Sequence, residues 1–318
     1  MGVETFARPT PSDGTFRHEA FFYDGDDDFV EGTTAFIREG VTAGEPTLVV
    51  VSAAKIHALQ RALGTASEKV HFADMADVGR NPARIIPAWR QFVADNSRTG
   101  RTLRGVGEPI GPSRSPEELV ECHRHEALLN VAFDDGPAWW LLCPYDTSAL
   151  HPAVVGEARR THPHVVDGDA QASPHYGDHD LGNPFSGVLA EPAGRPVELD
   201  FGPGFLGHIR GLVAREAEMS GLNKDRGYEL VMAVNEVVTN SLEHGGGRGR
   251  VRIWPGSGSV ICEVQDAGLI TDPLVGRRLP DETQPKGRGL WLANQLCDLV
   301  QLRSSECGTT VRLHMSAR

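Results

Sequence analysis

Residues 230–244 read LVMAVNEVVTNSLEH, and this pattern predicts a helix with one apolar and one polar side. The apolar positions recur at helical spacing and are Leu230, Val234, Val237, Val238 and Leu242. Glu236, Asn240 and His244 are spaced by one helical turn each, so they share one face. An amide oxygen can ligate Mg²⁺, and a carboxylate one turn earlier can accept a proton from a hydroxyl or a water. Alone, the pattern also fits an ordinary helix with a solvated face.

A second polar motif, Asp266-Ala267-Gly268, follows a predicted strand over residues 260–265. A carboxylate at the end of a strand can accept a hydrogen bond from an exocyclic amine, and a neighbouring glycine lets a purine ring approach the backbone closely. A simple turn without a special function is the alternative interpretation. The motif by itself leaves both interpretations open.

Two short motifs near the end of the chain complete the set. Gly287-Arg288-Gly289-Leu290 stands at the start of a predicted helix, where free backbone N–H groups and the positive helix end favour phosphate. Arg288 adds positive charge there. Gly308-Thr309-Thr310 opens the last predicted strand, where a threonine hydroxyl can reach a base through water. A lone Gly-x-Gly is not specific and threonine is common in strands, so neither motif decides the function alone.

The ordered set NEVVTN-x3-H, DAG, GRGL and GTT resembles the four sequence boxes of the GHKL ATPases, and most closely those of the bacterial anti-sigma-factor serine kinases. The resemblance covers residues 191–318. It implies an α+β sandwich of the Bergerat type that binds ATP and Mg²⁺ between the helix of Asn240 and the loop 287–289. It also implies a protein partner, namely a sigma factor or an anti-sigma-factor antagonist, and it is compatible with a homodimer.

The resemblance assigns roles to individual residues. Glu236 matches the base that activates a serine hydroxyl of the antagonist protein, and Asn240 matches the Mg²⁺ ligand. Asp266 matches the carboxylate that reads the adenine amine. The other positions assigned to the ATP site are His244, Gly268, Gly287, Arg288, Gly289, Leu290, Thr309 and Thr310.

Two other functions would use the same fold. In the first, ATP is a structural ligand that shapes a protein-docking face and no phosphoryl group moves. In the second, the chain is a sensor histidine kinase, which needs a phosphoacceptor histidine followed by an acidic residue on an upstream helical hairpin. His125-Glu126 has this order, but it lies within a predicted α/β domain and no second long helix follows it. The serine/threonine kinase is therefore the leading hypothesis.

Strands and helices alternate over residues 15–165, the predicted first domain. Residues 46–52 (PTLVVVS) and 138–143 predict buried strands, and residues 116–132 predict a helix. Such alternation is typical of an α/β domain with a mostly parallel sheet. Periodicity fades over residues 166–190, which are rich in Gly, Pro, Asp and His and predict a linker.

Four stretches of the first domain resemble the MEDS-type sensory domain of bacterial regulators, a relative of RecA-like ATPases. They are HEAFFY from His18, GVGEP from Gly105, ECHRHEALLN from Glu121 and LCPYD from Leu142. A nucleotide-binding relative would carry a phosphate loop after the first strand, but residues 24–28 read DGDDD and their carboxylates repel phosphate. The resemblance therefore implies a small-molecule signal or another regulatory role for this domain.

Five polar residues of the first domain are candidates for a sensory pocket, namely His18, Glu108, His125, Glu126 and Asp146. Of these, we expect His18, Glu126 and Asp146 to form a buried polar cluster. Such a cluster serves either ligand binding or the specificity of the fold. The sequence leaves these two roles open.

A metal site formed by Cys122, His123, His125 and Cys143 is not expected. Residues 122, 123 and 125 point to different sides of one predicted helix, so their side chains do not converge on one ion. His175 and His179 have a spacing that suits a metal, but they lie in the predicted linker. The sequence thus favours no metal in the first domain.

The composition limits the remaining classes of function. The chain has 318 residues and 40% hydrophobic content, enough for two packed domains. A net charge of -12 argues against direct binding of nucleic acid or of an acidic membrane. Five cysteines without a CxxC pair fit the reduced thiols of the cytosol. Residues 1–13 lack the apolar segment of a signal peptide, and no apolar run is long enough to span a membrane.

The sequence therefore predicts a cytosolic regulator with two domains. The first domain senses a signal. The second binds Mg-ATP and phosphorylates a serine or threonine of an antagonist protein, with sequestration of a sigma factor as a further activity.

Overall fold

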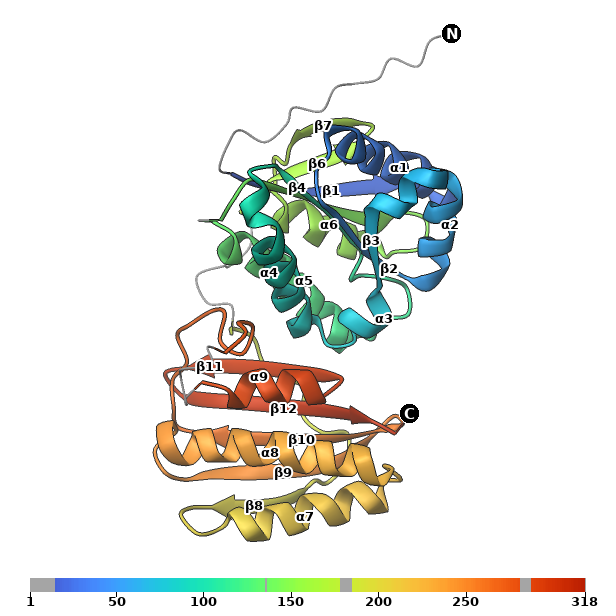
Figure 1. The fold of residues 1–318 in the computed structure, drawn as a ribbon. Coiled ribbons are helices and arrows are strands. Elements are labelled where there is room, and N and C mark those ends of the chain that lie inside the picture. The colour runs from blue at the N-terminus through green and yellow to red at the C-terminus, as the bar shows by residue number, and fades with distance from the viewer. Residues whose placement is uncertain (1–14, 135, 178–184, 281–286, 318) are drawn as a thin grey trace. The chain divides into compact units, whose positions relative to one another are not determined.

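The computed structural model describes residues 15–134, 136–177, 185–280 and 287–317. The chain divides into two compact units, which we describe separately (Figure 1). The first unit comprises residues 1–79 and 88–181, and the second comprises residues 80–87 and 182–318. The short segment 80–87 thus groups with the second unit, although the sequence on both sides of it belongs to the first.

The described part of the first unit contains a seven-stranded sheet in the order β3-β2-β4-β5-β1-β6-β7. Its strands are β1 (Phe16–Tyr23), β2 (Thr47–Val51), β3 (Val70–Asp74), β4 (Leu103–Gly107), β5 (Trp139–Asp146), β6 (His164–Asp167) and β7 (Asp169–Ala172). All neighbouring strands are parallel except β6 and β7, which form an antiparallel pair. The predicted α/β domain with a mostly parallel sheet is confirmed.

Helices cover both faces of this sheet (Figure 1). They are α1 (Gly25–Ala43), α2 (Ala53–Leu63), the short α3 (Met75–Val78), α4 (Ile85–Asn96), α5 (Pro116–Ala132) and α6 (Pro152–Thr161). Trp139 and Trp140 are successive residues of β5 and so face opposite sides. The ring of Trp140 meets Phe36 of α1 with centroids 5.2 Å apart, and the ring of Trp139 meets Trp89 of α4 at 5.4 Å. Helices α1 and α4 therefore pack on opposite faces.

Two features of the first unit are not part of the sequence prediction. Helix α1 begins at Gly25, so the acidic segment 25–28 is its first turn, where carboxylates interact favourably with the positive end of the helix. Strands β6 and β7 extend the sheet to Ala172, within the predicted linker 166–190. Residues of β7 are all exposed, so they lack the apolar pattern that would have predicted a strand.

The second unit contains a five-stranded antiparallel sheet in the order β11-β12-β10-β9-β8. Its strands are β8 (Val197–Phe201), β9 (Gly249–Gly256), β10 (Ser259–Asp266), β11 (Leu299–Ser305) and β12 (Gly308–Ser316). Its helices α7 (Leu206–Met219), α8 (Lys224–His244) and α9 (Gly289–Leu296) lie on one face of this sheet (Figure 1). The predicted α+β sandwich is confirmed.

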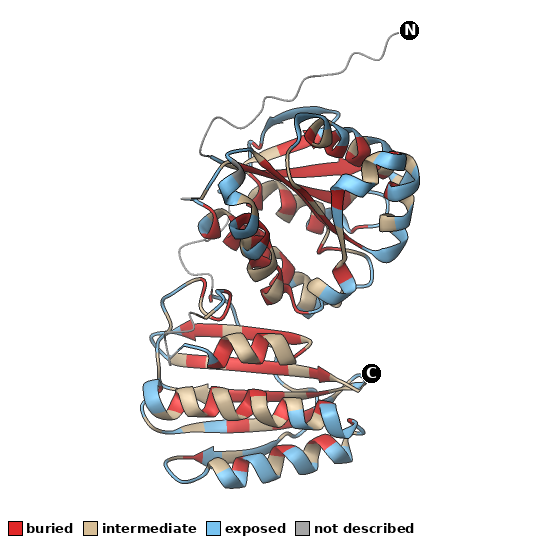
Figure 2. Ribbon diagram, viewed as in Figure 1, coloured by how far each residue is buried: buried red, intermediate tan, exposed pale blue. Residues whose placement is uncertain are grey.

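Helix α8 packs against the sheet with its apolar side. Asn223 begins the helix, because its side chain accepts a hydrogen bond from the backbone N–H of Arg226 at 2.9 Å. Leu230, Val234 and Val238 are fully buried in the core between helices and sheet. Figure 2 shows the same alternation along α8, with buried and partly exposed positions in turn. The two-sided helix predicted from residues 230–244 is confirmed.

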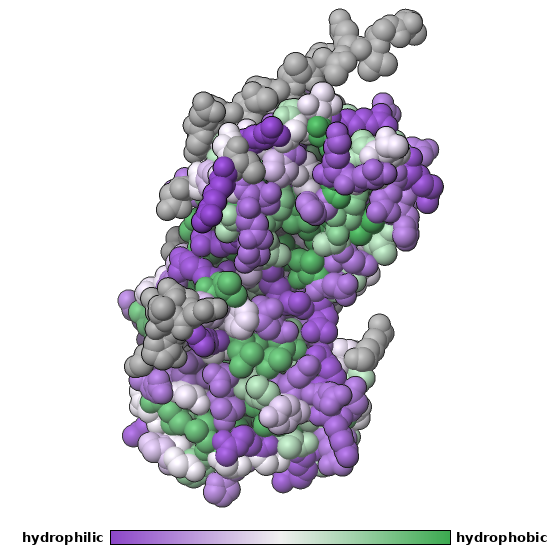
Figure 3. Space-filling model, viewed as in Figure 1, coloured by the Kyte–Doolittle hydropathy of each residue, from purple (hydrophilic) through white to green (hydrophobic). Residues whose placement is uncertain are grey.

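The surface of the first two helices is largely hydrophilic. Hydrophilic side chains cover much of α1 and α2 in the view of Figure 3, and Asp27, Glu31 and Arg38 are exposed on α1. Within the described residues, no helix combines the length and the hydrophobicity that a membrane crossing requires.

A buried ion-pair network on the sheet of the second unit gives a stability prediction. Glu263 is 1% exposed and accepts hydrogen bonds from Arg312 at 2.8 and 2.6 Å and from Arg252 at 3.0 Å. Glu263→Ala leaves two guanidinium groups without this counter-ion, so we expect the free energy of unfolding of the second unit to fall by about 3–5 kcal/mol. Denaturant unfolding measures this loss. Asp272→Ala removes the exposed pair with Arg278 and should cost less than about 1 kcal/mol; equal costs would contradict the prediction.

Candidate functional site

One cavity of about 270 Å³ in the second unit is lined by residues from all four predicted motifs. These are Asn240 and His244 of α8, Asp266 and Gly268 after β10, Gly287 and Leu290 at the start of α9, and Thr309 of β12. Asp266 and Thr309 are paired residues of neighbouring strands, and α8 and α9 cover that end of the sheet. The fold thus brings together segments that are separated by up to several tens of residues in the sequence.

The carboxylate of Asp266 is held in a fixed orientation at the wall of this cavity. Its Oδ1 accepts a hydrogen bond from the backbone N–H of Gly268 at 2.7 Å, and its Oδ2 accepts one from the hydroxyl of Ser241 at 2.5 Å. Each carboxylate oxygen has a further lone pair, so Asp266 can still accept a hydrogen bond from a ligand.

Two residues that support Asp266 are not among the residues predicted from the sequence. Ser241 follows Asn240 directly and donates to Asp266, and Gly245 follows the end of α8. A Cβ atom at Gly245 would lie only 2.4 Å from Cγ of Asp266, so any other residue would displace the carboxylate. In the sequence, only the position of Gly245 directly after His244 could have indicated its importance. The close approach of Gly245 to the carboxylate of Asp266 is visible only in the structure.

Thr309 holds the backbone of the Asp-Ala-Gly loop. Its hydroxyl donates to the carbonyl oxygen of Gly268 at 2.8 Å and contacts the hydroxyl of Ser304 at 2.8 Å. Thr310 is the next residue of β12 and therefore faces the other side of the sheet. It lines only a second cavity of about 770 Å³, to which Asp266 and Thr309 also contribute. Of the two threonines that the sequence nominates, only Thr309 lines the cavity that the four motifs share.

The start of α9 lies directly against Asn240. A Cβ atom at Gly289 would be 2.8 Å from Nδ2 and 3.3 Å from Oδ1 of Asn240, so only glycine permits this approach. Gly287 has a φ of 90°, in the left-handed region that favours glycine. Arg288 is the N-cap residue of α9 and is exposed. The backbone N–H groups of this helix start are thus close to the side chain that the sequence assigns to Mg²⁺.

Two predicted residues stand at or outside the edge of the cavity. Glu236 is half-buried one turn before Asn240 on α8 and does not line the cavity. His244 lines the cavity but is largely exposed at the last position of α8. Their assigned roles stay predictions.

The candidate residues of the first unit fall into two groups on different parts of the sheet. His18, His125 and Glu126 are buried where α5 covers the sheet, and Nε2 of His18 lies 3.1 Å from Oε2 of Glu126. Burial, followed by the nearby His162, lowers the pKa of His18 to about 4. This ring is therefore neutral at physiological pH.

The second group lies at the C-terminal ends of the central strands. Oε1 of Glu108 accepts hydrogen bonds from the hydroxyl of Tyr23 at 2.6 Å and from Nζ of Lys55 at 2.5 Å. Asp146, at the end of β5, accepts from the backbone N–H and the hydroxyl of Ser148. The expectation that Asp146 shares a cluster with His18 and Glu126 is wrong, because the carboxyl end of a parallel strand is far along the sheet from its start. Lys55 and Tyr23 were not predicted.

Two segments of the chain match known protein families. Residues 17–163 match the family model of MEDS, the MEthanogen/methylotroph, DcmR Sensory domain. Residues 203–315 match the family model of the histidine kinase-like ATPase domain. These matches confirm the resemblance of the first segment to MEDS domains and that of the second segment to histidine kinase-like ATPase domains. The closer resemblance to the anti-sigma-factor serine kinases stays a prediction.

Comparison with whole proteins adds little to these matches. No curated protein matches the chain. Among solved structures, the chain is similar to the RsbU and RsbW domains of Rv1364c from Mycobacterium tuberculosis, with 20% sequence identity and a TM-score of 0.30. The match covers 39% of this chain and 32% of that chain, so this chain spans about a third of the solved one.

The Glu108 group gives a prediction about pH. Burial, as the largest effect, raises the pKa of Glu108 above its usual value, while Lys55 and Tyr23 oppose this rise. Because the folded pKa is raised, the stabilising contribution of the protonated form is lost as the pH rises through that folded value. Lys55→Met removes the opposing cation, so we expect the pKa of Glu108 to rise further. The free energy of unfolding of the first unit should then fall over a wider pH range, and the total loss should be larger by about 1.4 kcal/mol for each further pKa unit.

Denaturant unfolding of the full chain at a series of pH values from acidic to mildly alkaline measures this total loss. Lys69→Met, an exposed position in the same unit, is the matched control and should leave the total loss unchanged. A Lys55→Met variant with the wild-type loss over this pH range would show that Lys55 does not compensate the charge of Glu108.

Proposed function

We propose that the second unit binds ATP with Mg²⁺ in the cavity lined by the four motifs and transfers the γ-phosphoryl group to a serine or threonine of an antagonist protein. The MEDS domain controls this activity in response to a small-molecule signal. The protein is then a cytosolic regulator of the anti-sigma-factor kinase type, and a sigma factor is a second partner.

One observation supports this proposal most. Residues from four motifs that are distant in the sequence line a single cavity, within the segment that matches the histidine kinase-like ATPase domain. A concave site with a few convergent polar groups is the usual form of a small-ligand site. The larger cavity contains no residue of α8 or α9, so it lacks both the amide of Asn240 and the backbone N–H groups at the start of α9.

The lining residues fit the parts of the nucleotide by their chemistry. Asp266 offers a free lone pair for the adenine amine, and the N–H groups from Gly287 to Gly289 suit phosphate oxygens. The amide oxygen of Asn240 is a hard donor of the kind that Mg²⁺ prefers. Bound Mg-ATP would supply the phosphoryl group and neutralise part of its charge.

Glu236 is the residue that we assign as the general base. It lies one turn before Asn240 on the same face of α8 and outside the cavity lining. In the proposed complex, other residues contact the adenine, the phosphates and Mg²⁺. The carboxylate of Glu236 therefore remains available to the hydroxyl of a second substrate. Its carboxylate then accepts the hydroxyl proton during transfer.

Phosphorylation of the chain's own His125 is not supported by its environment. His125 is 1% exposed and Glu126 is 0% exposed, within the α/β core of the first unit. A phosphoacceptor must meet the nucleotide of a kinase domain, and a fully buried ring cannot do so without local unfolding. The burial of His125 therefore favours a separate protein as the acceptor of the phosphoryl group.

Asp266→Asn and Asn240→Ala test the nucleotide site. In Asp266→Asn, the amide oxygen can still accept from Gly268, but one acceptor for the adenine amine is lost. We expect ATP affinity to fall by about tenfold or more in each variant, since a hydrogen bond to a charged group contributes about 1.5–3 kcal/mol. In Asn240→Ala, the dependence of binding on Mg²⁺ should also disappear.

Isothermal titration of the full chain with ATP, with and without Mg²⁺, measures both effects. Asp225→Asn is the matched control, because Asp225 is exposed in the first turn of α8, far from its cavity end. Absence of ATP binding to the wild-type chain would reject the proposed function as a whole.

Glu236→Gln separates a kinase from a protein that uses ATP only as a structural ligand. The variant should bind ATP like the wild type but should not transfer label from γ-³²P-ATP to a protein of a lysate of the source cells. Glu243→Gln, an exposed position of the same helix, should keep the transfer. If the wild-type chain transfers label to no protein, ATP is better explained as a structural ligand that shapes a docking face. Acid-labile label on the chain itself would favour a histidine kinase.

A further inference from the structure

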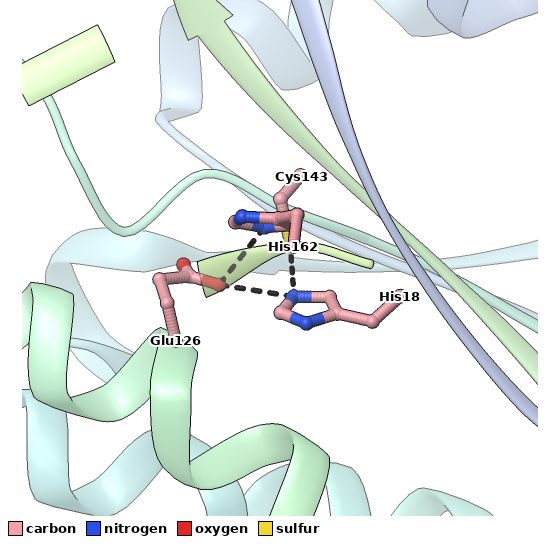
Figure 4. A group of neighbouring side chains, drawn as sticks. All are labelled: His18, Glu126, Cys143 and His162. Atoms are coloured by element: carbon pink, nitrogen blue, oxygen red, sulfur yellow. Dashed lines mark hydrogen bonds and ion pairs between the residues drawn. The ribbon is translucent and has the colours of Figure 1, made fainter. Parts of the chain in front are cut away.

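Four buried side chains of the first unit point toward one another. They are His18 of β1, Glu126 of α5, Cys143 of β5 and His162, the residue after α6 (Figure 4). Each side chain offers one nitrogen, oxygen or sulfur atom, and these atoms all lie within 4.8 Å of one another. The side chains of both histidines and of Glu126 are 0% exposed, and Cys143 is 1% exposed.

The fold explains why these residues meet. Strands β1 and β5 are parallel neighbours in which Ala20 is opposite Cys143. His18 is two residues before Ala20, so His18 and Cys143 are on the same face of the sheet. Helix α5 contributes Glu126 to this face, and the end of α6 contributes His162. Four separate elements therefore converge on one point.

Three of the distances between the donor atoms are close to the edges of a metal coordination tetrahedron. Oε2 of Glu126 is 3.1 Å from Nε2 of His18 and 3.3 Å from Nε2 of His162. Sγ of Cys143 is 3.4 Å from Nε2 of His18. Tetrahedral Zn²⁺ with bonds of about 2.0–2.1 Å to N and O and about 2.3 Å to S places neighbouring donors ~3.3–3.6 Å apart. Three of the donor pairs thus already have nearly the spacing that one ion requires, and all four donors lie within 4.8 Å of one another.

Hydrogen bonds on the outer side of each ring fix its tautomer. Nδ1 of His162 is 2.8 Å from the carbonyl oxygen of Ala158, which can only accept. Nδ1 of His18 is 3.1 Å from Oδ1 of Asn130, and Asn130 Nδ2 donates to the carbonyl oxygen of Thr161 at 2.8 Å, so the amide orientation is set. Both rings therefore carry Nδ1–H, the arrangement found in metal-binding histidines.

This tautomer leaves a lone pair on Nε2 of each ring, and both lone pairs face Oε2 of Glu126. Two lone pairs and a carboxylate oxygen repel one another unless a positive charge lies between them. A second proton on each ring would place two imidazolium ions with centroids 4.0 Å apart in a site without solvent, which is unfavourable. A single divalent cation removes both conflicts.

We propose that His18, Glu126, Cys143 and His162 bind one divalent transition-metal ion, with Zn²⁺ as the preferred metal. Imidazole, thiolate and carboxylate together suit a metal of intermediate softness, whereas Mg²⁺ and Ca²⁺ prefer oxygen ligands alone. Binding converts the Cys143 thiol to a thiolate and releases its proton to solvent. The two negative ligands then balance the charge of the ion, so the buried site is neutral.

The position of the ligands assigns a structural role to this ion. All four coordination positions of a tetrahedral ion are filled by protein and none is exposed, as in structural rather than catalytic zinc sites. The ion ties α5 and α6 to the centre of the sheet through β1 and β5. Metal loading therefore stabilises the α5 and α6 side of the MEDS domain, independently of any nucleotide at the second unit.

The test uses the full chain, stripped with a chelator and then dialysed against Zn²⁺ or Co²⁺. We expect one metal ion per chain by elemental analysis, a raised melting temperature with Zn²⁺, and, with Co²⁺, tetrahedral visible bands together with a thiolate-to-cobalt charge-transfer band. Cys143→Ala should lose the charge-transfer band and bind at least about tenfold more weakly. Cys262→Ala, an equally buried cysteine of the second unit, is the matched control and should keep both.

Asn130→Ala provides a variant that retains all four ligands. It removes the acceptor that fixes the His18 tautomer, together with the donor to the carbonyl oxygen of Thr161, so affinity should fall by about 10–100-fold while the charge-transfer band persists at saturating Co²⁺. The proposal is overturned if the wild-type chain binds neither metal, or if its Co²⁺ form has no thiolate band, a result that does not depend on the folding of any variant. It is also overturned if Cys143→Ala binds the metal as the wild type does.

Discussion

The close approach of the end of α8 to the end of β10 is the constraint on which the candidate nucleotide site depends. Asp266 accepts hydrogen bonds from Ser241 of α8 and from its own loop at Gly268, and Gly245 leaves the space that its carboxylate occupies. If α8 were displaced by the width of one methyl group, Asp266 would lose its orientation. Gly289 likewise packs against the side chain of Asn240 so closely that a Cβ atom would have to displace that side chain. Glycines at these contacts leave the space that the polar groups occupy, and the hydroxyl of Ser241 orients the carboxylate of Asp266.

Much of the second unit could be predicted from its sequence because its signals are local. The apolar spacing in α8 and the order of the four motifs depend on residues close to one another in the chain. Thr309 and Thr310 show the limit of such local signals, because both fit the motif and the sequence does not say which of them lines the cavity. Only the side of β12 that each one faces distinguishes them. Ser241 and Gly245 likewise owe their importance to a contact with a strand more than twenty residues later.

The first unit shows the same limit more strongly. The cysteine and histidines of α5 were weighed as metal ligands because they are close in sequence, and they were rejected because one helix cannot aim them at one ion. The residues that do converge come from two strands, the middle of α5 and the end of α6. Cys143 was common to both sets, but His162 had no periodic pattern or motif to single it out. Its role follows from the parallel pairing of β1 and β5 and from the packing of α6 beside α5.

The buried carboxylates of this protein show why the site at Glu126 differs from the others. Glu263 is neutralised by two arginines, and Glu19 by Arg17 with a further hydrogen bond from Trp140. Glu126 is equally buried, yet its neighbours are two histidines whose protons are directed away from it and a thiol. Its Oε1 has no hydrogen-bond partner among the described residues. Since an uncompensated buried carboxylate costs several kcal/mol, the same rule that explains the arginines at Glu263 favours a positive charge at Glu126, and the surrounding nitrogen and sulfur atoms suit the proposed metal ion.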